Sequence, residues 1–193
     1  MKKTFLGFGC AAVLGMAGGA HAGLSTFDSP TLVTIDNATQ VATYVESGNR
    51  FSGDAASFLT IDFFGAGGTG GLVGFAGGGF NLTADVGGLF SLLALDYAAL
   101  DPSSASSSSQ LQLHGVLFDN STRDVTLLLG NFAHADFSNF VSLKQLSFAA
   151  NADFVLDNVN TFIHAVPEPT SMALVGTALT GLLFTRRRRG KQS

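Results

Sequence analysis

The sequence has a single cysteine, no tryptophan and few basic residues outside its two ends. With only Cys10, the chain has neither an internal disulfide nor a cysteine-ligated zinc site, so a folded domain depends on its hydrophobic core. Exposed tryptophan and tyrosine are the usual stacking partners of sugar rings, and the only tyrosines are Tyr44 and Tyr97. This composition weakens a carbohydrate-binding interpretation.

The N-terminus has the three regions of a secretory signal peptide. Lys2 and Lys3 supply positive charge, Phe5 to Met16 is apolar, and Ala20-His21-Ala22 is an A-x-A cleavage site. The sequence therefore predicts export through the Sec translocon, a signal peptide that ends at Ala22, and a mature chain that starts at Gly23. Removal of the signal peptide also removes the cysteine, which excludes thiol catalysis in the mature protein.

The segment between the signal peptide and residue 166 is strongly acidic. It holds thirteen acidic residues and only three basic ones, Arg50, Arg123 and Lys144. The phosphate groups of nucleic acids repel such a surface, so nucleic acid is excluded as a partner. Divalent cations are compatible with it.

The C-terminus has three consecutive parts over residues 166–193. Val166, Pro167, Glu168 and Pro169 come first, and the two prolines predict an extended segment because they fix φ and remove backbone donors. The uncharged run of 13 residues from Met172 to Phe184 follows. It predicts a short transmembrane helix of roughly 20 Å, below the roughly 30 Å hydrocarbon thickness of a bilayer.

A cluster of four arginines closes this segment: Arg186, Arg187, Arg188 and Arg189. Arginines resist translocation and stop the chain in the membrane, which places them in the cytoplasm and the preceding domain outside. An ordinary C-terminal anchor that is never cut has the same physical features.

These three parts, in this order at the C-terminus, closely resemble the PEP-CTERM sorting signal. The resemblance implies recognition by an exosortase, a membrane transpeptidase that cuts the tail, in a Gram-negative bacterium that makes exopolysaccharide. It implies transient inner-membrane anchoring and then delivery to the cell envelope or extracellular matrix. The run Phe154-Val155-Leu156-Asp157-Asn158-Val159 is similar to the strand that often closes β-sandwich passengers of this kind.

Residues 23–165 predict an all-β fold, namely one β-sandwich or jelly-roll-like domain. Short runs rich in β-branched and aromatic residues are separated by Gly, Asn, Asp and Ser. The predicted strands span residues 31–35, 41–46, 58–64, 72–75, 80–86, 89–95, 111–118, 125–129, 141–148 and 154–162. Two further stretches look like loops. We expect a flexible hairpin or a close backbone approach in the glycine-rich 65–79, and a mobile surface loop in the serine-rich 101–109.

The glycine-rich stretch contains Gly65-Ala66-Gly67-Gly68-Thr69-Gly70, which formally matches the G-x-G-x-x-G motif of dinucleotide-binding sites. Such a site needs a helix whose N-terminus meets the pyrophosphate. The ten residues that follow contain five more glycines, which no helix tolerates. We therefore read the stretch as a loop.

Aspartates provide the candidate metal ligands, with calcium as the candidate ion. Asp119 and Asp124 lie in a stretch that starts like a calcium loop but lacks the glycine and glutamate of an EF-hand. Asp153 and Asp157 are expected on one face of the last strand. The alternative at each position is a solvated or turn-capping carboxylate, and no other cofactor is expected.

No catalytic residues stand out. The sequence has no G-x-S-x-G nucleophile motif, and His114, His134 and His164 lack zinc-binding spacing. We therefore expect a non-enzymatic protein with a structural or adhesive role in the exopolysaccharide matrix. A carbohydrate-binding module is the second hypothesis and an exported hydrolase is the third.

Overall fold

The computed structural model describes residues 20–28, 33–61 and 65–164, which all belong to one compact unit, Gly19–Val166. Every regular element among them is a β-strand, which confirms the all-β prediction. The strands are β1 (His21–Ser25), β2 (Thr34–Asp36), β3 (Val41–Glu46), β4 (Asn49–Asp54), β5 (Phe58–Ile61), β6 (Gly71–Gly74), β7 (Gly79–Ala84), β8 (Phe90–Ala99), β9 (Gln110–Leu117), β10 (Thr122–Leu128), β11 (Ala133–Asp136), β12 (Leu143–Ala150) and β13 (Phe154–Ile163).

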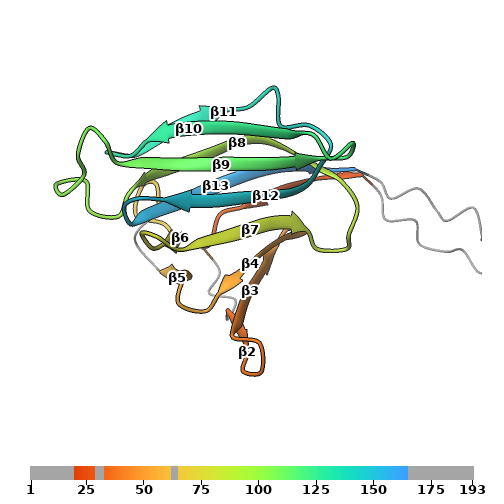
Figure 1. The fold of residues 1–193 in the computed structure, drawn as a ribbon, viewed down its shortest axis with the longest axis horizontal. Coiled ribbons are helices and arrows are strands. Elements are labelled where there is room, and N and C mark those ends of the chain that lie inside the picture. The colour runs from red at the N-terminus through yellow and green to blue at the C-terminus, as the bar shows by residue number, and fades with distance from the viewer. Residues whose placement is uncertain (1–19, 29–32, 62–64, 165–193) are drawn as a thin grey trace, which may run out of the picture. The chain divides into compact units, whose positions relative to one another are not determined.

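The strands form two layers of an antiparallel β-sandwich (Figure 1). The first layer runs β2-β3-β4-β7-β12-β9-β10. The second layer places β8 between β11 and β13, and β13 pairs on its other edge with β6 and β1, while β5 pairs with β6. A single pair, Leu143 with Phe90, joins β12 to β8 and makes the two layers one continuous sheet.

Alternation of side chains decides which face of each strand is buried. In β7, Phe80, Leu82 and Ala84 are buried, whereas the residues between them are partly exposed. In β12, Leu146 and Phe148 point inward in the same way. Strands of this pattern bury one face against the opposite layer and leave the other face to solvent.

A cluster of phenylalanine rings fills the core, and Phe80 lies at its centre. The Phe80 ring centroid is 5.1 Å from that of Phe148, 5.2 Å from Phe58, 5.8 Å from Phe154 and 6.3 Å from Phe51. These partners come from both layers, so one side chain joins four other strands. Most phenylalanines among the described residues are buried in this core.

The glycine-rich stretch is not one long loop. Its second half contains β6, whose four residues are all buried. Gly74 faces the ring of Phe154, which would clash with a β-carbon at that position. The glycine at position 74 therefore allows close packing of β6 on Phe154. A strand rather than a helix follows Gly70, so the stretch lacks the helix that a dinucleotide-binding site needs.

The first half of the stretch, residues 65–70, forms a tight turn held by Asp157. The carboxylate of Asp157 accepts hydrogen bonds from Ala66 N at 2.8 Å and Thr69 Oγ1 at 2.9 Å on one oxygen, and from Asn158 N at 2.6 Å on the other. Asp157 is 1% exposed. Its burial raises the pKa of the carboxyl group above the ordinary value, although these hydrogen bonds oppose the shift.

Three strands went unpredicted, β1, β4 and β11. β1 spans the end of the predicted signal peptide. In β4 only Phe51 is both bulky and buried, and β11 is a short, mostly exposed edge strand. A turn signal does precede β4, because Ser47 and Gly48 both have positive φ, 52° and 81°, as a two-residue hairpin turn requires. The strand predicted over residues 89–95 is β8, which extends further than predicted, to Ala99.

We expect Phe80→Ala to lower the free energy of unfolding by about 3–5 kcal/mol, because it removes a buried ring and leaves a cavity. Urea unfolding of a chain that ends at Val166 measures this change. Phe118→Ala is the matched control, since Phe118 is 65% exposed and should change stability by less than about 0.5 kcal/mol. Equal effects of the two substitutions would contradict the central place of Phe80.

We expect Asp157→Asn to destabilise the domain by about 1–3 kcal/mol, because an amide keeps only one acceptor oxygen for three donors.

The loss of stability caused by Asp157→Asn depends on pH. Because burial raises the pKa of Asp157, the protonated carboxyl group is bound more tightly in the folded state than in the unfolded state. The resulting stabilisation of wild type is fully present below about pH 3.8 and is lost as pH rises through the folded pKa. The stability difference between wild type and Asp157→Asn should therefore narrow as pH rises from about 4. A difference that stays constant or widens would contradict this account.

Candidate functional site

The chain ends of the domain lie side by side. Strands β1 and β13 are antiparallel partners, with His21 opposite Ile163 and Ala22 opposite Phe162. Figure 1 shows β1 in red and the end of β13 in blue next to each other at the right. The chain therefore enters and leaves the domain at neighbouring points.

The residues predicted for signal cleavage fall at this end. Ala20 is the first described residue, and the predicted cleavage site between Ala22 and Gly23 lies inside β1. Strand β1 thus includes two residues, His21 and Ala22, that cleavage would remove. Both are exposed, whereas Gly23 and Ser25 are buried.

A buried polar network fixes the part of β1 that follows the predicted cleavage site. Asn49 donates to Ser25 Oγ at 2.9 Å and accepts from Thr161 Oγ1 at 2.8 Å. Thr161 also bonds to the carbonyl oxygen of Gly23, at 3.2 Å. Ser25, Asn49 and Thr161 are each fully buried, so this network ties β1 to strands of both layers.

The packing around Gly23 leaves no room for a side chain. A β-carbon there would lie 2.5 Å from the carbonyl oxygen of Ser47 and 2.9 Å from Thr161 Oγ1. Only glycine fits this position without displacement of its neighbours. The first residue of the predicted mature chain is therefore also a structural residue.

The other chain end is held by hydrogen bonds from His164, the last described residue. Its backbone N–H donates to the Leu89 carbonyl at 2.9 Å, and its Nε2 lies 2.9 Å from Ser91 Oγ. Only Ala165 separates His164 from Val166. The predicted sorting residues Val166, Pro167, Glu168 and Pro169, the apolar run 172–184, and Arg186, Arg187, Arg188 and Arg189 lie outside the described residues.

In the part of the chain that the structure describes, no helix is long and apolar enough to cross a membrane.

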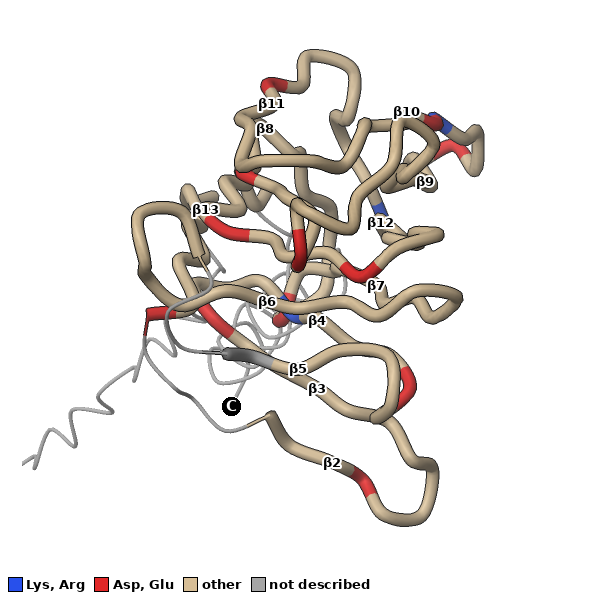
Figure 2. Tube along the Cα trace, turned by 90° about the vertical axis from the view of Figure 1, so that its left-hand side faces the viewer, with Lys and Arg blue, Asp and Glu red and all other residues tan. Residues whose placement is uncertain are grey.

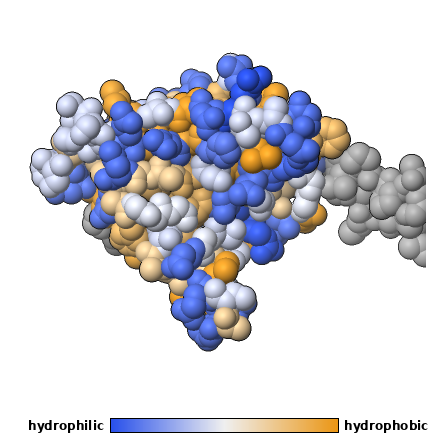
Figure 3. All heavy atoms as spheres, in the orientation of Figure 1, coloured by the Kyte–Doolittle hydropathy of each residue, from blue (hydrophilic) through white to orange (hydrophobic). Residues whose placement is uncertain are grey.

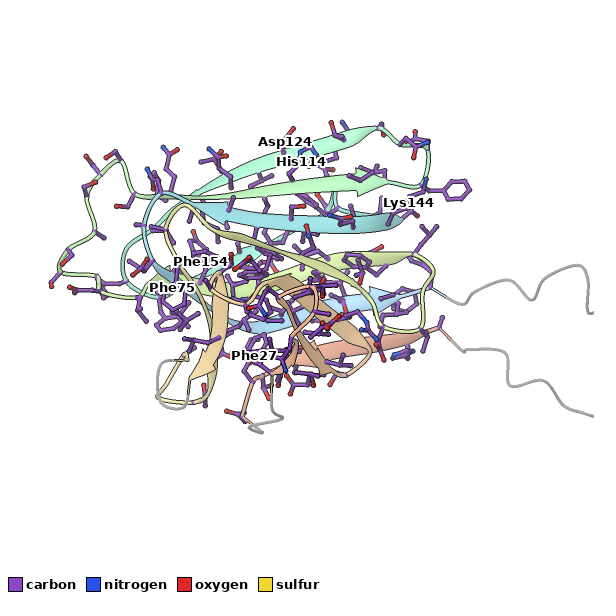
Figure 4. All side chains as sticks on the ribbon, turned by 60° about the horizontal axis from the view of Figure 1, so that its bottom comes forward. Phe27, Phe75, His114, Asp124, Lys144 and Phe154 are labelled. Atoms are coloured by element: carbon purple, nitrogen blue, oxygen red, sulfur yellow. The ribbon has the colours of Figure 1, made fainter. Side chains whose placement is uncertain are left out.

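The four candidate calcium ligands lie in different surroundings. Asp119 caps a turn and accepts from Ser121 N at 2.9 Å and Ser121 Oγ at 2.6 Å, and these bonds lower the pKa of its carboxyl group. Asp124 lies 2.6 Å from His114 Nδ1 (Figure 4). Asp157 holds the turn at residues 65–70.

The expected placement of Asp153 beside Asp157 on one strand face is wrong. β13 begins at Phe154, so Asp153 lies in the turn before it, where its carboxylate accepts from Ala76 N of the turn between β6 and β7 at 2.8 Å. Among the described residues, no group of three or more His, Cys, Asp or Glu side chains is placed to hold a metal ion. Calcium binding stays a prediction.

Acidic residues are spread over the strand ends and loops rather than gathered in one place (Figure 2). One surface group joins Asp96, His134 and Asp136 on the exposed edge of the second layer. His134 Nδ1 lies 2.5 Å from Asp96 Oδ1 and Nε2 lies 3.3 Å from Asp136 Oδ1. The hydrogen bond to Asp96 raises the pKa of His134, which favours its cationic form.

A row of polar residues crosses the outer face of the first layer, one from each strand. We call it the polar lane, and its members are successive cross-strand partners: Asp124, His114, Ser147, Asn81, Ser52, Thr43 and Thr34. With strands about 4.8 Å apart, the lane spans roughly 29 Å. No large apolar side chain interrupts it.

Hydrogen bonds order the centre of the polar lane. Ser147 Oγ and Gln145 Nε2 both donate to Asn81 Oδ1, each at 2.7 Å. Two donors of the first layer therefore converge on the amide oxygen of Asn81. The lane therefore offers donors and acceptors held in fixed positions on a rigid sheet.

A shallow cavity of about 270 Å³ lies at the other end of β8 and β13, away from the chain ends. It is lined by Ala99, Asp101, Ser104, Ala105, Ala152 and Asp153. Part of the serine-rich loop 101–109 thus packs against the domain, and Ala105 contacts the core. Both carboxylates in the cavity already accept local hydrogen bonds.

Neither tyrosine forms an exposed ring surface on which a sugar could stack. Tyr44 and Tyr97 are 1% and 9% exposed. The most exposed phenylalanine, Phe118, lies under the Lys144 ammonium group, which is 5.6 Å from the ring centroid. In Figure 3, hydrophilic residues cover much of the viewed face, with hydrophobic residues among them.

Comparisons with known proteins give a sequence match at the C-terminus and a distant likeness in fold. No curated protein matches the chain. A family 29 carbohydrate-binding module variant shares 11% identity and a TM-score of 0.45 over 78% of this chain and 100% of its own. A family 16 carbohydrate-binding module shares 15% identity and a TM-score of 0.37 over 54% of this chain and 84% of its own.

A third structure is a family 22 carbohydrate-binding module from Clostridium thermocellum xylanase Xyn10B. It shares 13% identity and a TM-score of 0.39, over 75% of this chain and 95% of its own.

The family match is to the PEP-CTERM protein-sorting motif and covers residues 165–189. It contains the sorting residues and the arginines that the sequence predicted. The chain therefore carries a PEP-CTERM protein-sorting motif, the C-terminal signal of exported proteins that are anchored in transit and processed by an exosortase.

Proposed function

We propose that this protein is a non-enzymatic component of the bacterial cell envelope or exopolysaccharide matrix, with a structural or adhesive role. The Sec translocon exports it, the apolar run 172–184 holds it in the inner membrane, and an exosortase cuts the tail. The released product is then the β-sandwich that starts at Gly23.

The observation that carries this proposal is the position of the sorting motif. The matched segment begins at residue 165, directly after His164, the last described residue, which the β-sandwich holds through Leu89. The cargo of the sorting signal is therefore this single sandwich, with no second domain between it and the tail. A sorted protein of this kind acts where the sandwich is delivered.

The contacts of the titratable side chains favour a structural role. His114 and His134 bind aspartates on the strand surface, and His164 binds Ser91 at the chain end. The aspartates at positions 119, 153 and 157 hold turns. Each of these groups has a local structural partner that accounts for its place in the domain.

A carbohydrate-binding module is the second candidate, and the polar lane is the observation in its favour. An extended polysaccharide presents hydroxyl groups along its length, and the lane presents donors and acceptors on seven adjacent strands. Such a surface would bind through hydrogen bonds alone, with little aromatic stacking. This mode gives weak, repeated contacts, as an adhesive matrix protein requires.

Intact mass spectrometry of the protein recovered from its native cell surface or medium tests sorting and release. We expect a mass that starts at Gly23 and ends near Pro169, because both targeting segments are removed. In cells without the exosortase the mass should include Arg186 to Ser193. An unchanged C-terminus in the two strains would show an uncut anchor and overturn the proposed release.

A pull-down with polysaccharide from the host tests the second candidate. If the lane binds glycan, Asn81→Ala combined with Ser147→Ala should weaken binding at least tenfold, because it removes the ordered centre of the lane. Both side chains are only partly buried, so the fold should persist. Ser103→Ala, an exposed change in the loop 101–109, is the control. Binding that is equal in all three proteins would exclude the lane as the glycan site.

A further inference from the structure

Strand β10 forms one edge of the first layer, because β9 is its only strand partner among the described residues (Figure 1). It spans seven residues, whereas the edge strands β2, β5 and β11 have three or four. Proteins protect exposed edges with short strands, prolines, lysines or β-bulges. β10 contains no proline or lysine and keeps one unbroken register with β9. It is therefore a long edge without these forms of protection.

The hydrogen bonds at the two ends of β10 show which of its backbone groups face outward. Leu117 N donates to Ser121 O at 2.9 Å at one end. Leu129 N donates to Ser109 O at 2.9 Å at the other end. Hydrogen-bonded and non-hydrogen-bonded pairs alternate along an antiparallel ladder.

Within this register, every second residue of β10 points its N–H and C=O groups away from β9. These residues are Thr122, Asp124, Thr126 and Leu128. In the described part of the chain, none of their outward backbone groups has a backbone hydrogen-bond partner. The edge can therefore accept a further strand.

The side chains of β10 alternate between the core and the outer face of the sandwich. Val125 and Leu127 are half-buried and pack against the core. Asp124 and Thr126 are exposed on the outer face, where the Asp124 carboxylate binds His114 of its own sheet at 2.6 Å. A strand that continues the first layer must likewise be apolar toward the core and polar outside.

A second copy of β10 has this pattern and fits the length of the edge. Val125 is the middle residue of β10, so an antiparallel copy related by a two-fold axis at Val125 pairs all seven residues. The axis is perpendicular to the sheet and keeps inward side chains inward. The pairs are Thr122 with Leu128, Arg123 with Leu127, Asp124 with Thr126, and Val125 with itself. The free groups then form eight backbone hydrogen bonds, four donated by each copy.

We propose that β10 is an interface at which two copies of this chain join edge to edge and continue the first layer as one sheet. An axis at Asp124 or Thr126 would leave two residues of each strand unpaired, and an axis at Asp124 would set two carboxylates opposite each other. With the axis at Val125, no like charges are opposed. The pairing goes beyond the proposed matrix role and does not depend on removal of the tail.

Disulfide capture tests the interface. Val125→Cys is made in a chain that also carries Cys10→Ser, so that the introduced thiol is the only one. Opposite Cα atoms in a non-hydrogen-bonded pair lie about 4.5 Å apart, within the range of a disulfide. The full-length chain is produced in its host, the cells are treated with an oxidant, and non-reducing electrophoresis gives the dimer fraction. We expect at least ten times more dimer than from Thr122→Cys, whose two thiols would lie about 20 Å apart.

Two exposed positions test the register without a change in the core. Thr122→Cys and Leu128→Cys should each give little dimer alone, because neither residue lies opposite its own copy. Co-expression of the two chains should give at least tenfold more dimer, since Thr122 of one copy lies opposite Leu128 of the other. Both side chains are exposed, so the fold should persist.

Thr126→Pro tests the backbone hydrogen bonds of the interface. It removes an outward N–H donor without loss of a bond to β9, so the single chain should still fold. Co-expressed Thr122→Cys and Leu128→Cys chains that both carry Thr126→Pro should form at least tenfold less dimer. Thr126→Ala keeps the donor and is the matched control, with an unchanged dimer fraction. Urea unfolding of each variant checks that the domain is folded.

Each outcome supports the interface or overturns it. Absence of dimer from both Val125→Cys and the co-expressed pair, or disulfides to another protein only, would exclude a second copy as the partner of β10. Equal dimer from Thr122→Cys alone and from the co-expressed pair would overturn the register. Dimers that persist with Thr126→Pro in a folded domain would overturn the backbone pairing. Dimers of a protein that keeps its tail would contradict the proposed release and support the interface.

Discussion

The pairing of the last strand with three others is the constraint on which the second layer depends. β13 pairs with β8 along most of its length, with β6 at its start and with β1 at its end. Its side chains also reach the main features of the domain: Phe154 packs on Phe80, Asp157 holds the turn at 65–70, and Thr161 completes the buried network. The strand that leads into the sorting signal is thus the strand that organises the sandwich.

A domain without disulfides needs such a dense centre. The ring of Phe80 contacts rings from both layers. The bond between Thr161 and Asn49 and the strand pair of Leu143 with Phe90 also join the layers. Hydrophobic burial and aromatic packing therefore replace covalent cross-links in a protein made for export. The polar network at β1 makes the strand pairing more specific, because few alternative registers would satisfy all of its buried hydrogen bonds.

Local patterns in the sequence were enough to predict the fold class and most strands. Alternation in Val41 to Glu46 gave β3 with its observed bounds, and the runs of apolar residues located β9, β12 and β13. β1, β4 and β11 were missed because their stability comes from neighbours. β1 depends on pairing with β13, Phe51 alone anchors β4 in the core, and β11 depends on pairing with β8. Alternation of apolar and polar residues arises where one face of a strand is buried. An edge strand with both faces exposed has no such alternation in its sequence.

The candidate sites show the same limit. The sorting motif is contiguous, so it could be identified from residues 166–193 directly. The polar lane unites residues from positions 34 to 124 and 147, and only the register of seven strands places them in one row. The role of Asp157 was also hidden, since its partners Ala66 and Thr69 lie 91 and 88 residues earlier in the chain.

The pairing of β1 with β13 also sets when the domain can finish folding. The bond between Thr161 and Gly23 joins residues 138 positions apart. At a synthesis rate of about 5–20 residues per second, β1 is made roughly 7–28 s before its partner. During that interval the N-terminal strand has no place to pair, and closure of so long a loop is slow. The chain therefore stays unfolded at its N-terminal edge until its last strand arrives, when the sorting tail is next to be synthesised.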